Sequence, residues 1–263
     1  MLPSCVPATP LDESGAILDY RAIDSFYDHP RVQGLAEMMN FVGAINGDEQ
    51  TVEKIVAAQA HHKKIDGHAP DLQGNDLNAY IAAGVYSDHE CHDVKDAIAK
   101  LERGQFIMIR EGTAARNLEA LMPLLTGKYA DRCMFCTDDK HIDDIKNEGH
   151  INYNVNKSIE LGLSPMTAIQ MATIHTAKHF RMEEEIGSIT PGRLADIILC
   201  DSIEKIVPKE VWFEGKPVAE NSVLTAKPEI RKYPDWIKDT VHLLKPVYAE
   251  RFELECPEEK IHN

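Results

Sequence analysis

The strongest constraint on the fold is a repeated spacing along the chain. Short apolar runs, each ending in a polar residue, alternate with amphipathic stretches that have the period of a helix. The residues that end five successive runs are Glu37, His68, His89, Arg110 and Asp138, which follow one another at intervals of 21 to 31 residues. Each interval accommodates one strand, one helix and two loops. The spacing therefore predicts βα units, with a parallel sheet and helical crossovers.

Two parallel architectures have this period, an open doubly wound sheet and a (β/α)8 barrel. A barrel gathers the C-terminal ends of its strands into one ring, and active sites of such barrels lie there. Because the polar residues all follow strands, we favour an α/β fold with a TIM-like barrel. We find five clear strands and one possible strand at 2–6, fewer than the eight that close a barrel. We therefore expect a partial barrel that another chain closes, or a sequence that is part of a longer one.

The alternation of apolar runs and amphipathic stretches ends after Asp138. Two helices are predicted over 152–161 and 165–180, the second with Ser164 as N-cap and Pro165 at its first position. These helices complete the barrel region.

Three segments are predicted. Residues 1–185 form the incomplete barrel. Residues 186–220 carry short β-like runs with turn signals and form part of a small β-sandwich module. Residues 221–263 are polar and rich in proline, which indicates a linker or the start of a C-terminal domain.

Charge and composition exclude several functional classes. Lys and Arg total 28 against 43 Asp and Glu, a formal charge of −15, so we expect no nucleic-acid partner, although an uncharged nucleobase is compatible with this balance. Since no apolar run approaches about 18 residues, we expect no membrane partner. We find no secretion signal, and the cysteines do not form a disulfide framework, which predicts a cytoplasmic protein. Cys133 and Cys136 are interpreted as strand residues, because one Cys-x-x-Cys pair is weak support for zinc.

Four of the residues at strand ends have the chemistry of a metal site. Glu37, His68, His89 and Asp138 offer two carboxylates and two imidazoles, which are ligands for zinc, manganese or iron. A bound metal lowers the pKa of its water towards about 7, and a neighbouring carboxylate can move the released proton. We expect Glu37 to bridge two metal ions and Asp138 to carry protons.

Each of these residues also has a structural interpretation. Glu37 could be a salt-bridge partner and His68 a turn residue. His89 could hydrogen-bond Asp88 or Glu90, and Asp138 could cap the next helix. Four such coincidences at neighbouring strand ends are less probable than one metal site.

His175 and His179 are four residues apart on a predicted helix and could form another metal pair. Two ligands without a carboxylate or cysteine to complete the set do not make a zinc site, so we interpret them as packed or surface histidines.

Several motifs together resemble the adenine deaminases of the amidohydrolase superfamily. They are Met1–Pro10, Gly34–Asn40, Asp66-Gly-His-Ala-Pro70, Asp76–Gly84, Ser87-Asp-His-Glu-Cys91, Ile109-Arg-Glu-Gly112 and Cys136-Thr-Asp-Asp139. The stretch Gly187-x-Ile-x-x-Gly192-x-x-Ala195-Asp196 resembles the general signature of the superfamily, where the chain returns from the barrel to a small β domain. The similarity covers nearly all of the chain.

The resemblance implies metal-dependent hydrolysis of adenine to hypoxanthine and ammonia, a reaction of adenine catabolism and purine salvage. Manganese or iron is the usual metal, zinc is possible, and the complete protein has a binuclear site. Glu37 takes the bridging position that other members fill with a carboxylated lysine, His68 and His89 are metal ligands, and Asp138 is a ligand and proton shuttle. Residues assigned to substrate contact or support are Arg110, Glu111, Arg116, Asp139 and His150. We also expect a homo-oligomer.

One departure from the superfamily pattern is the lack of a His-x-His motif, which supplies the first metal ligands on strand one in the family. The sequence therefore corresponds to about strands 3–8 of the family barrel, and we expect weak or no activity from this chain alone. Two alternatives stay open: another amidohydrolase reaction, such as cyclic amide hydrolysis, or a non-catalytic remnant that associates through its open edges.

Overall fold

The computed structural model describes residues 1–9, 11–227, 232–238, 240 and 242–253. The chain divides into two units, Met1–Lys227 and Pro228–Asn263. In the second unit the described residues include two short 3-10 helices, η2 (Asp235–Lys238) and η3 (Ala249–Phe252). Part of the predicted segment 221–263, including 228–231 and 254–263, lies outside the described residues. The segment boundaries at 185 and 220 stay predictions.

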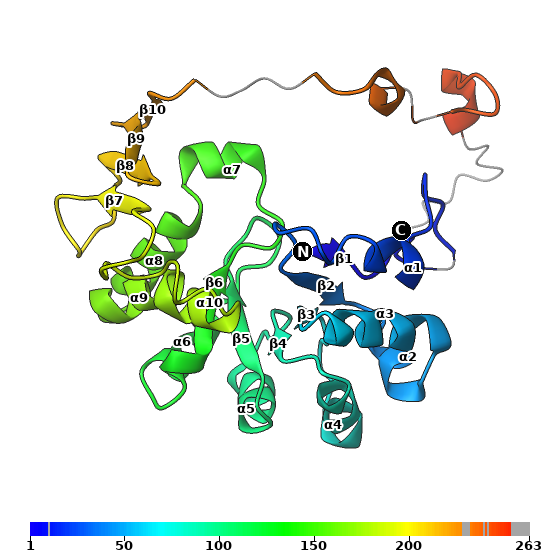
Figure 1. Cartoon of the computed structure of the whole chain (residues 1–263), viewed down its shortest axis with the longest axis horizontal. Coiled ribbons are helices and arrows are strands. Elements are labelled where there is room, and N and C mark those ends of the chain that lie inside the picture. The colour runs from blue at the N-terminus through cyan, green and yellow to red at the C-terminus, as the bar shows by residue number, and fades with distance from the viewer. Residues whose placement is uncertain (10, 228–231, 239, 241, 254–263) are drawn as a thin grey trace, which may run out of the picture. The chain divides into compact units, whose positions relative to one another are not determined.

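Six parallel strands form the centre of the first unit (Figure 1). One sheet has the order β1-β2-β3 and another the order β4-β5-β6. The strands are β1 (Leu2–Pro3), β2 (Gly34–Met38), β3 (Lys64–Gly67), β4 (Ser87–Asp88), β5 (Phe106–Arg110) and β6 (Cys133–Cys136). The described strands do not close into a barrel. The predicted α/β fold and partial barrel are confirmed, and the possible strand at 2–6 is the short β1.

A glycine brings the two sheets close together. The amide of Gly67, at the end of β3, donates to Ser87 Oγ at the start of β4 over 3.3 Å. A Cβ atom on Gly67 would lie 2.0 Å from the carbonyl oxygen of Ser87, so no other residue fits without moving the strands apart. The residues that follow β3 and β4 are therefore held side by side.

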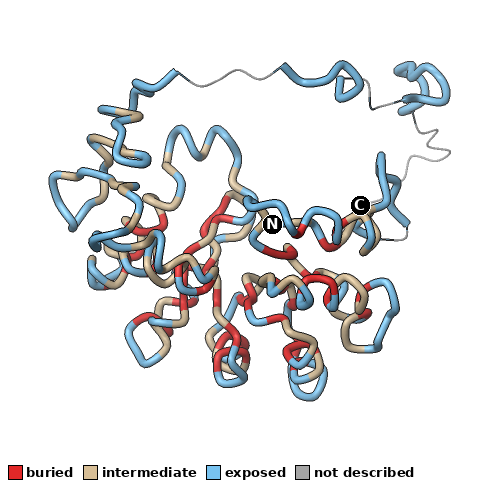
Figure 2. The backbone as a smooth tube through the Cα atoms, viewed as in Figure 1, coloured by how far each residue is buried: buried red, intermediate tan, exposed pale blue. Residues whose placement is uncertain are grey.

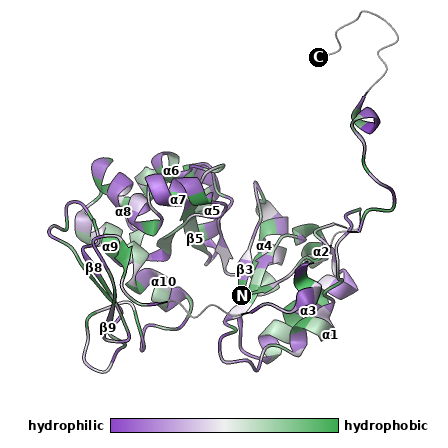
Figure 3. Cartoon of the chain, turned by 90° about the horizontal axis from the view of Figure 1, so that it is seen from above, coloured by the Kyte–Doolittle hydropathy of each residue, from purple (hydrophilic) through white to green (hydrophobic). Residues whose placement is uncertain are grey.

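Helices follow the strands in the expected alternation (Figure 1). They are α1 (Tyr20–Asp24), α2 (Phe41–Asn46), α3 (Glu49–Ala60), α4 (Gly74–Ala82), α5 (Val94–Glu102), α6 (Leu118–Leu125), α7 (Ile142–Asn147), α8 (Ile151–Glu160), α9 (Pro165–Ala172) and α10 (Ile174–His179), with the 3-10 helix η1 (Ala130–Arg132) before β6. Hydrophobic and hydrophilic residues both occur along the flanking helices (Figure 3), as expected of helices that cover a sheet on one face.

Side-chain caps begin several helices. Asp48 accepts a hydrogen bond from the Thr51 amide at the start of α3, and Asp93 accepts from the Asp96 amide at the start of α5. The predicted cap at Ser164, followed by a proline, is confirmed for α9.

A single helix over 165–180 is wrong, because the backbone leaves the helical region at Thr173, with φ −130° and ψ −92°. The side-chain hydroxyl of Thr173 donates to the Ile169 carbonyl over 2.6 Å. The segment therefore forms two helices, α9 and α10.

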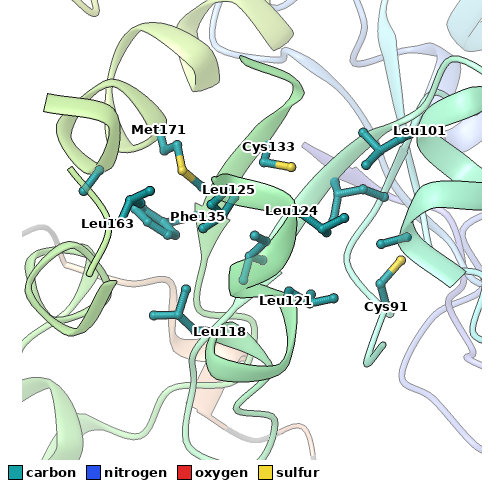
Figure 4. Packing of buried hydrophobic residues seen from close by; sticks show 14 of the residues in the cluster. Cys91, Leu101, Leu118, Leu121, Leu124, Leu125, Cys133, Phe135, Leu163 and Met171 are labelled. Carbon is teal, nitrogen blue, oxygen red and sulfur yellow. The ribbon is translucent and has the colours of Figure 1, made fainter. Parts of the chain in front are cut away.

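Two apolar cores lie in the first unit, and Figure 2 shows their buried residues along the strands and the flanking helices. One core joins β2 and β3 to α3 and α4. The other joins β5 and β6 to α5, α6, α8 and α9, and Figure 4 shows Leu118, Leu121 and Leu125 of α6 in it. Of the two cysteines that we interpret as buried strand residues, Cys133 is fully buried in this second core, whereas Cys136 at the end of β6 is only partly buried.

A separate antiparallel sheet follows α10, with the order β10-β9-β8-β7. Its strands are β7 (Ile197–Leu199), β8 (Glu210–Phe213), β9 (Lys216–Glu220) and β10 (Val223–Leu224). This sheet is the β-rich region that the turn signals predicted, with a last short strand beyond residue 220. Among the described helices, none is long and apolar enough to cross a membrane.

Candidate active site

Glu37, His68 and His89 meet at the C-terminal ends of three strands. Glu37 lies within β2, and His68 and His89 directly follow β3 and β4. Glu37 Oε2 lies 2.8 Å from His89 Nε2 and 3.3 Å from His68 Nδ1. The two imidazole rings lie edge to face, with centroids 5.4 Å apart. The structure thus brings together three of the four residues that the sequence singled out. We call them the open cluster, because each side chain is partly exposed.

Hydrogen bonding sets the protonation of the open cluster. Hydrogen bonds from His68 and His89 hold the pKa of Glu37 far below its usual range, against the opposing effect of burial. Burial lowers the pKa of His89, but the hydrogen bond and charge of Glu37, with the charges of Asp88 and Glu90, outweigh it and raise the pKa. Glu37 is therefore an ionised carboxylate that accepts hydrogen bonds from both imidazoles.

The geometry of the open cluster suits a divalent metal ion. One carboxylate oxygen and one nitrogen from each imidazole lie within 4.8 Å of one another. Mixed carboxylate and imidazole ligands are used for zinc, manganese and iron. A metal ion binds neutral imidazole and ionised carboxylate, so these three side chains would hold it in those forms.

Asp138 joins the site through Arg110. Arg110 ends β5 and donates from Nη1 to Asp138 Oδ2 over 2.8 Å. Asp138 also belongs to a second group of possible ligand atoms with His89 and Glu90. The alternative of an N-cap is wrong for Asp138, because α7 has His141 at its N-cap position and no side-chain cap bond.

Glu90 is a site residue that the sequence analysis treated only as a possible partner of His89. Its Oε1 atom lies 3.3 Å from His89 Nε2 and 3.4 Å from His68 Nδ1, and it pairs with Arg110. Glu90 thus links the open cluster to the Arg110–Asp138 pair. Its position directly after His89, at the same strand end, was the signal that could have identified it.

The remaining candidates lie farther along the same face or inside the fold. Glu111 is fully buried, and its oxygens accept from Lys157 Nζ and from the Leu118 amide. Arg116 pairs with Glu148 over 3.1 Å.

Two further candidates are exposed. His150 Nε2 lies 3.4 Å from Thr137 Oγ1, and Asp139 follows Asp138 directly. The structure thus joins Arg110 to the cluster, while contacts of Glu111, Arg116, Asp139 and His150 with substrate stay predictions.

His175 and His179 serve packing. His175 Nδ1 lies 3.2 Å from the Cys133 carbonyl oxygen. His179 is buried against the ring of Phe106, 5.1 Å between centroids, and approaches Asp66. Neither belongs to a group of possible metal ligands in the described part of the chain, which agrees with their interpretation as packed histidines.

The sequence of this chain is similar to proteins of known family. The model of the amidohydrolase family matches residues 1–240. The adenine deaminase of Kosmotoga olearia is 43% identical over 256 residues, which are 97% of this chain and 44% of the relative. The adenine deaminase of Dehalococcoides mccartyi is 44% identical over 260 residues, 99% of this chain and 45% of the relative. The chain therefore spans less than half the length of these relatives.

Solved structures share the fold at low sequence identity. The β-aspartyl dipeptidase of Fervidobacterium islandicum AW-1 has a TM-score of 0.59 and 14% identity, over 79% of this chain and 63% of that one. The N-acetylglucosamine-6-phosphate deacetylase of Pasteurella multocida has a TM-score of 0.57 and 12% identity, over 76% of this chain and 60% of that one. With parallel βα units and a family match over most of its length, this chain belongs to the amidohydrolase family.

Proposed function

We propose that this chain forms the main part of a metal-dependent active site that hydrolyses adenine to hypoxanthine and ammonia. The observation that carries the proposal is the open cluster, in which Glu37 lies within 3.3 Å of two imidazoles from neighbouring strand ends. The relatives described above, which are adenine deaminases, support adenine as the substrate.

The proposed metal is Mn²⁺ or Fe²⁺, with Zn²⁺ also compatible with the ligand types. Glu37, His68 and His89 would hold it, with Asp138 as a further ligand. The first three fit because their ligand atoms already converge within 4.8 Å. We also propose a binuclear site in the complete protein, to which Glu37 would contribute its carboxylate. The 263 residues contain no His-x-His motif, so a second ion would need other ligands.

In the proposed reaction, a C–O bond forms at C6 of adenine and the bond from C6 to the exocyclic nitrogen breaks. A metal ion held by these residues would lower the pKa of its water to about 7, so that hydroxide would be available near neutral pH. Asp138 accepts one proton of the attacking water, and both protons of the water are delivered in the reaction, one to ring nitrogen N1 and one to the amine that leaves as ammonia. Arg110 holds the Asp138 carboxylate beside His89. Glu37 fixes the orientation of both imidazoles.

The proposal extends to the setting of the reaction. We propose a small-molecule substrate, a homo-oligomer and a cytoplasmic location, with no nucleic-acid or membrane partner. The formal charge of −15 supports the absence of a nucleic-acid partner, because phosphate binding requires basic surfaces.

A chimera tests the function. The matching segment of the Kosmotoga olearia adenine deaminase is replaced by this chain, the protein is loaded with Mn²⁺, and hypoxanthine and ammonia are measured. We expect activity in the chimera and its loss in His89→Ala. The matched control is His92→Ala, an exposed histidine outside the open cluster, which should keep activity.

A folded, metal-loaded chimera that does not deaminate adenine would contradict the proposal, as would His89→Ala that stays active. The same assay on the chain alone measures how much of the site its own 263 residues supply.

A further inference from the structure

A buried lysine bonds to the two loops that carry the imidazoles of the open cluster. Lys100 is in α5, and its side chain is 0% exposed. Its ammonium donates to Asp88 Oδ2 over 2.9 Å, to Asp96 Oδ2 over 2.9 Å and to the Ala69 carbonyl over 2.7 Å. A buried lysine is rare unless it is paired, and all three bonds of this ammonium are made inside the protein.

Two of these bonds lead to the loops that carry His68 and His89. Ala69 directly follows His68, and Asp88 directly precedes His89. Asp88 completes the connection, because its Oδ1 accepts from the Ala69 amide over 2.8 Å and its Oδ2 accepts from the Glu90 amide over 3.0 Å. The buried ion pair between Lys100 and Asp88 therefore connects the loop that carries His68 to the loop that carries His89.

The acidic residues around Lys100 also satisfy the distance criterion for a metal site. Ligand atoms of Asp88, Cys91 and Asp96 lie within 4.8 Å of one another. The Lys100 ammonium already lies among them, 3.6 Å from Cys91 Sγ, and Cys91 is at the edge of the apolar core in Figure 4. We call Asp88, Cys91, Asp96 and Lys100 the sealed cluster. Its cation is the protein's own, and a metal ion would have to displace it.

Lys100 stays charged in this setting. Burial lowers its pKa, but the charge of Asp88 and the hydrogen bond and charge of Asp96 outweigh burial and raise the pKa. The ammonium thus keeps all three of its donors.

We propose that Lys100 is a positioning residue that fixes the spacing of His68 and His89 and thereby sets the metal affinity of the open cluster. The inference rests on the proposed metal site. Lys100 does not touch the proposed metal or substrate, and it acts through the Ala69 carbonyl and the Asp88 carboxylate.

Mn²⁺ affinity is the first test. The purified chain and its variants are titrated with Mn²⁺, and free Mn²⁺ is followed by its electron paramagnetic resonance signal. Loss of a group that orients metal ligands weakens binding by about 10- to 100-fold, and we expect this for Lys100→Met. The matched control is Asp96→Asn, which alters the same buried cluster but contacts neither loop, and whose amide oxygen can still accept from Lys100. We expect its Mn²⁺ affinity to be unchanged.

A second variant separates charge from position. Lys100→Met with Asp96→Asn removes one positive and one negative charge, so the sealed cluster keeps its formal charge. We expect this double variant to bind Mn²⁺ as weakly as Lys100→Met. Recovery of full affinity would overturn the positioning role, because it would show that only the charge balance matters.

Hydrogen exchange without metal is the third measurement, and it separates this inference from the proposed function. We expect the amides of Ala69 and Glu90 to exchange faster in Lys100→Met than in the unaltered chain or Asp96→Asn. Unchanged exchange and unchanged Mn²⁺ affinity in a folded Lys100→Met would overturn the inference.

If Lys100→Met does not fold, the Mn²⁺ affinity and amide exchange of the double variant are compared with those of Asp96→Asn instead. An unaltered chain that does not bind Mn²⁺ would refute the metal site and with it the role of Lys100 in metal affinity. Exchange would then still show whether Lys100 holds the two loops.

Discussion

The open cluster and the sealed cluster both contain carboxylates and adjoin the end of β4, but they differ in the partner that the carboxylates face. In the open cluster, Glu37 faces two imidazoles, and its side chain is 39% exposed. In the sealed cluster, Asp88 and Asp96 face an ammonium, and neither side chain is more than 1% exposed. An imidazole can lose its proton and present a lone pair to a metal ion, whereas a lysine ammonium is only a donor. Clustered carboxylates therefore indicate a metal site only where the partner that balances their charge can lose its proton and bind the ion.

The two clusters also differ in what their loss should affect. The sealed cluster is buried, so breaking it leaves an uncompensated charge inside the protein. The open cluster borders solvent, so water can compensate a change there. Perturbing the first should mainly change stability, and perturbing the second should mainly change metal binding.

The largest expected effect is on the sealed cluster. Lys100→Met should lower the free energy of unfolding by about 3–5 kcal/mol, because Asp88 and Asp96 lose their buried counter-charge. Urea denaturation followed by circular dichroism measures it. Lys128→Met, at an exposed lysine, is the control and should change stability by less than about 0.5 kcal/mol. If Lys100→Met lowers the free energy of unfolding no more than the control does, the sealed cluster does not stabilise the protein as we expect.

The next effect is on the open cluster. Glu37→Gln should weaken Mn²⁺ binding by at least about 10- to 100-fold, since it removes the charged ligand and the partner of both imidazoles. Calorimetric titration gives the affinity. If Glu37→Gln binds Mn²⁺ as the unaltered chain does, the metal site lies elsewhere.

Competition between protons and Mn²⁺ for the imidazoles should have a smaller effect. It distinguishes the open cluster from the sealed cluster, because only the open cluster should bind Mn²⁺ in a pH-dependent way. The pKa of His89 is raised above its ordinary value of about 6.5, so protons compete with a metal ion at and above that pH. Falling pH protonates the ligand, and affinity should drop by about tenfold per pH unit for each proton displaced. Mn²⁺ titrations between pH 8 and pH 6, values chosen as roughly bracketing the histidine range, measure this slope. Affinity that does not change with pH would exclude the imidazoles as ligands.

The smallest effect concerns the helix that carries Lys100. Asp93→Ala removes the side-chain cap of α5 and should lower stability by about 1 kcal/mol. Mn²⁺ affinity should be unchanged, because the bonds from Lys100 to Asp88 and Ala69 do not involve the cap. A parallel fall in affinity would mean that the metal site responds to any loss of stability in α5, and not specifically to Lys100.

Much of the fold and part of the candidate site could be predicted from the sequence. Parallel topology places the ends of successive strands at one edge, so Glu37, His68 and His89 could be grouped from their spacing alone. Helix starts were predictable where a cap and a proline coincide, as at Ser164 and Pro165. Both depend on local patterns that the fold preserves.

What could not be predicted depends on tertiary partners. Lys100 lies in an amphipathic helix where a lysine is usually a solvated residue, and its burial becomes favourable only because Asp88 arrives from β4. Glu90 could turn towards either solvent or His68, and the pairing with Arg110 decides this. The break at Thr173 coincides with a hydrogen bond from its side chain to the Ile169 carbonyl, and no glycine or proline marks this position in the sequence.

The most direct test of the account is anomalous diffraction from crystals of this chain soaked in Mn²⁺. We expect an anomalous peak bounded by Glu37 Oε2, His68 Nδ1 and His89 Nε2, and none within the sealed cluster. A peak between Asp88 and Asp96, or a saturated soak with no peak at the open cluster, would contradict it.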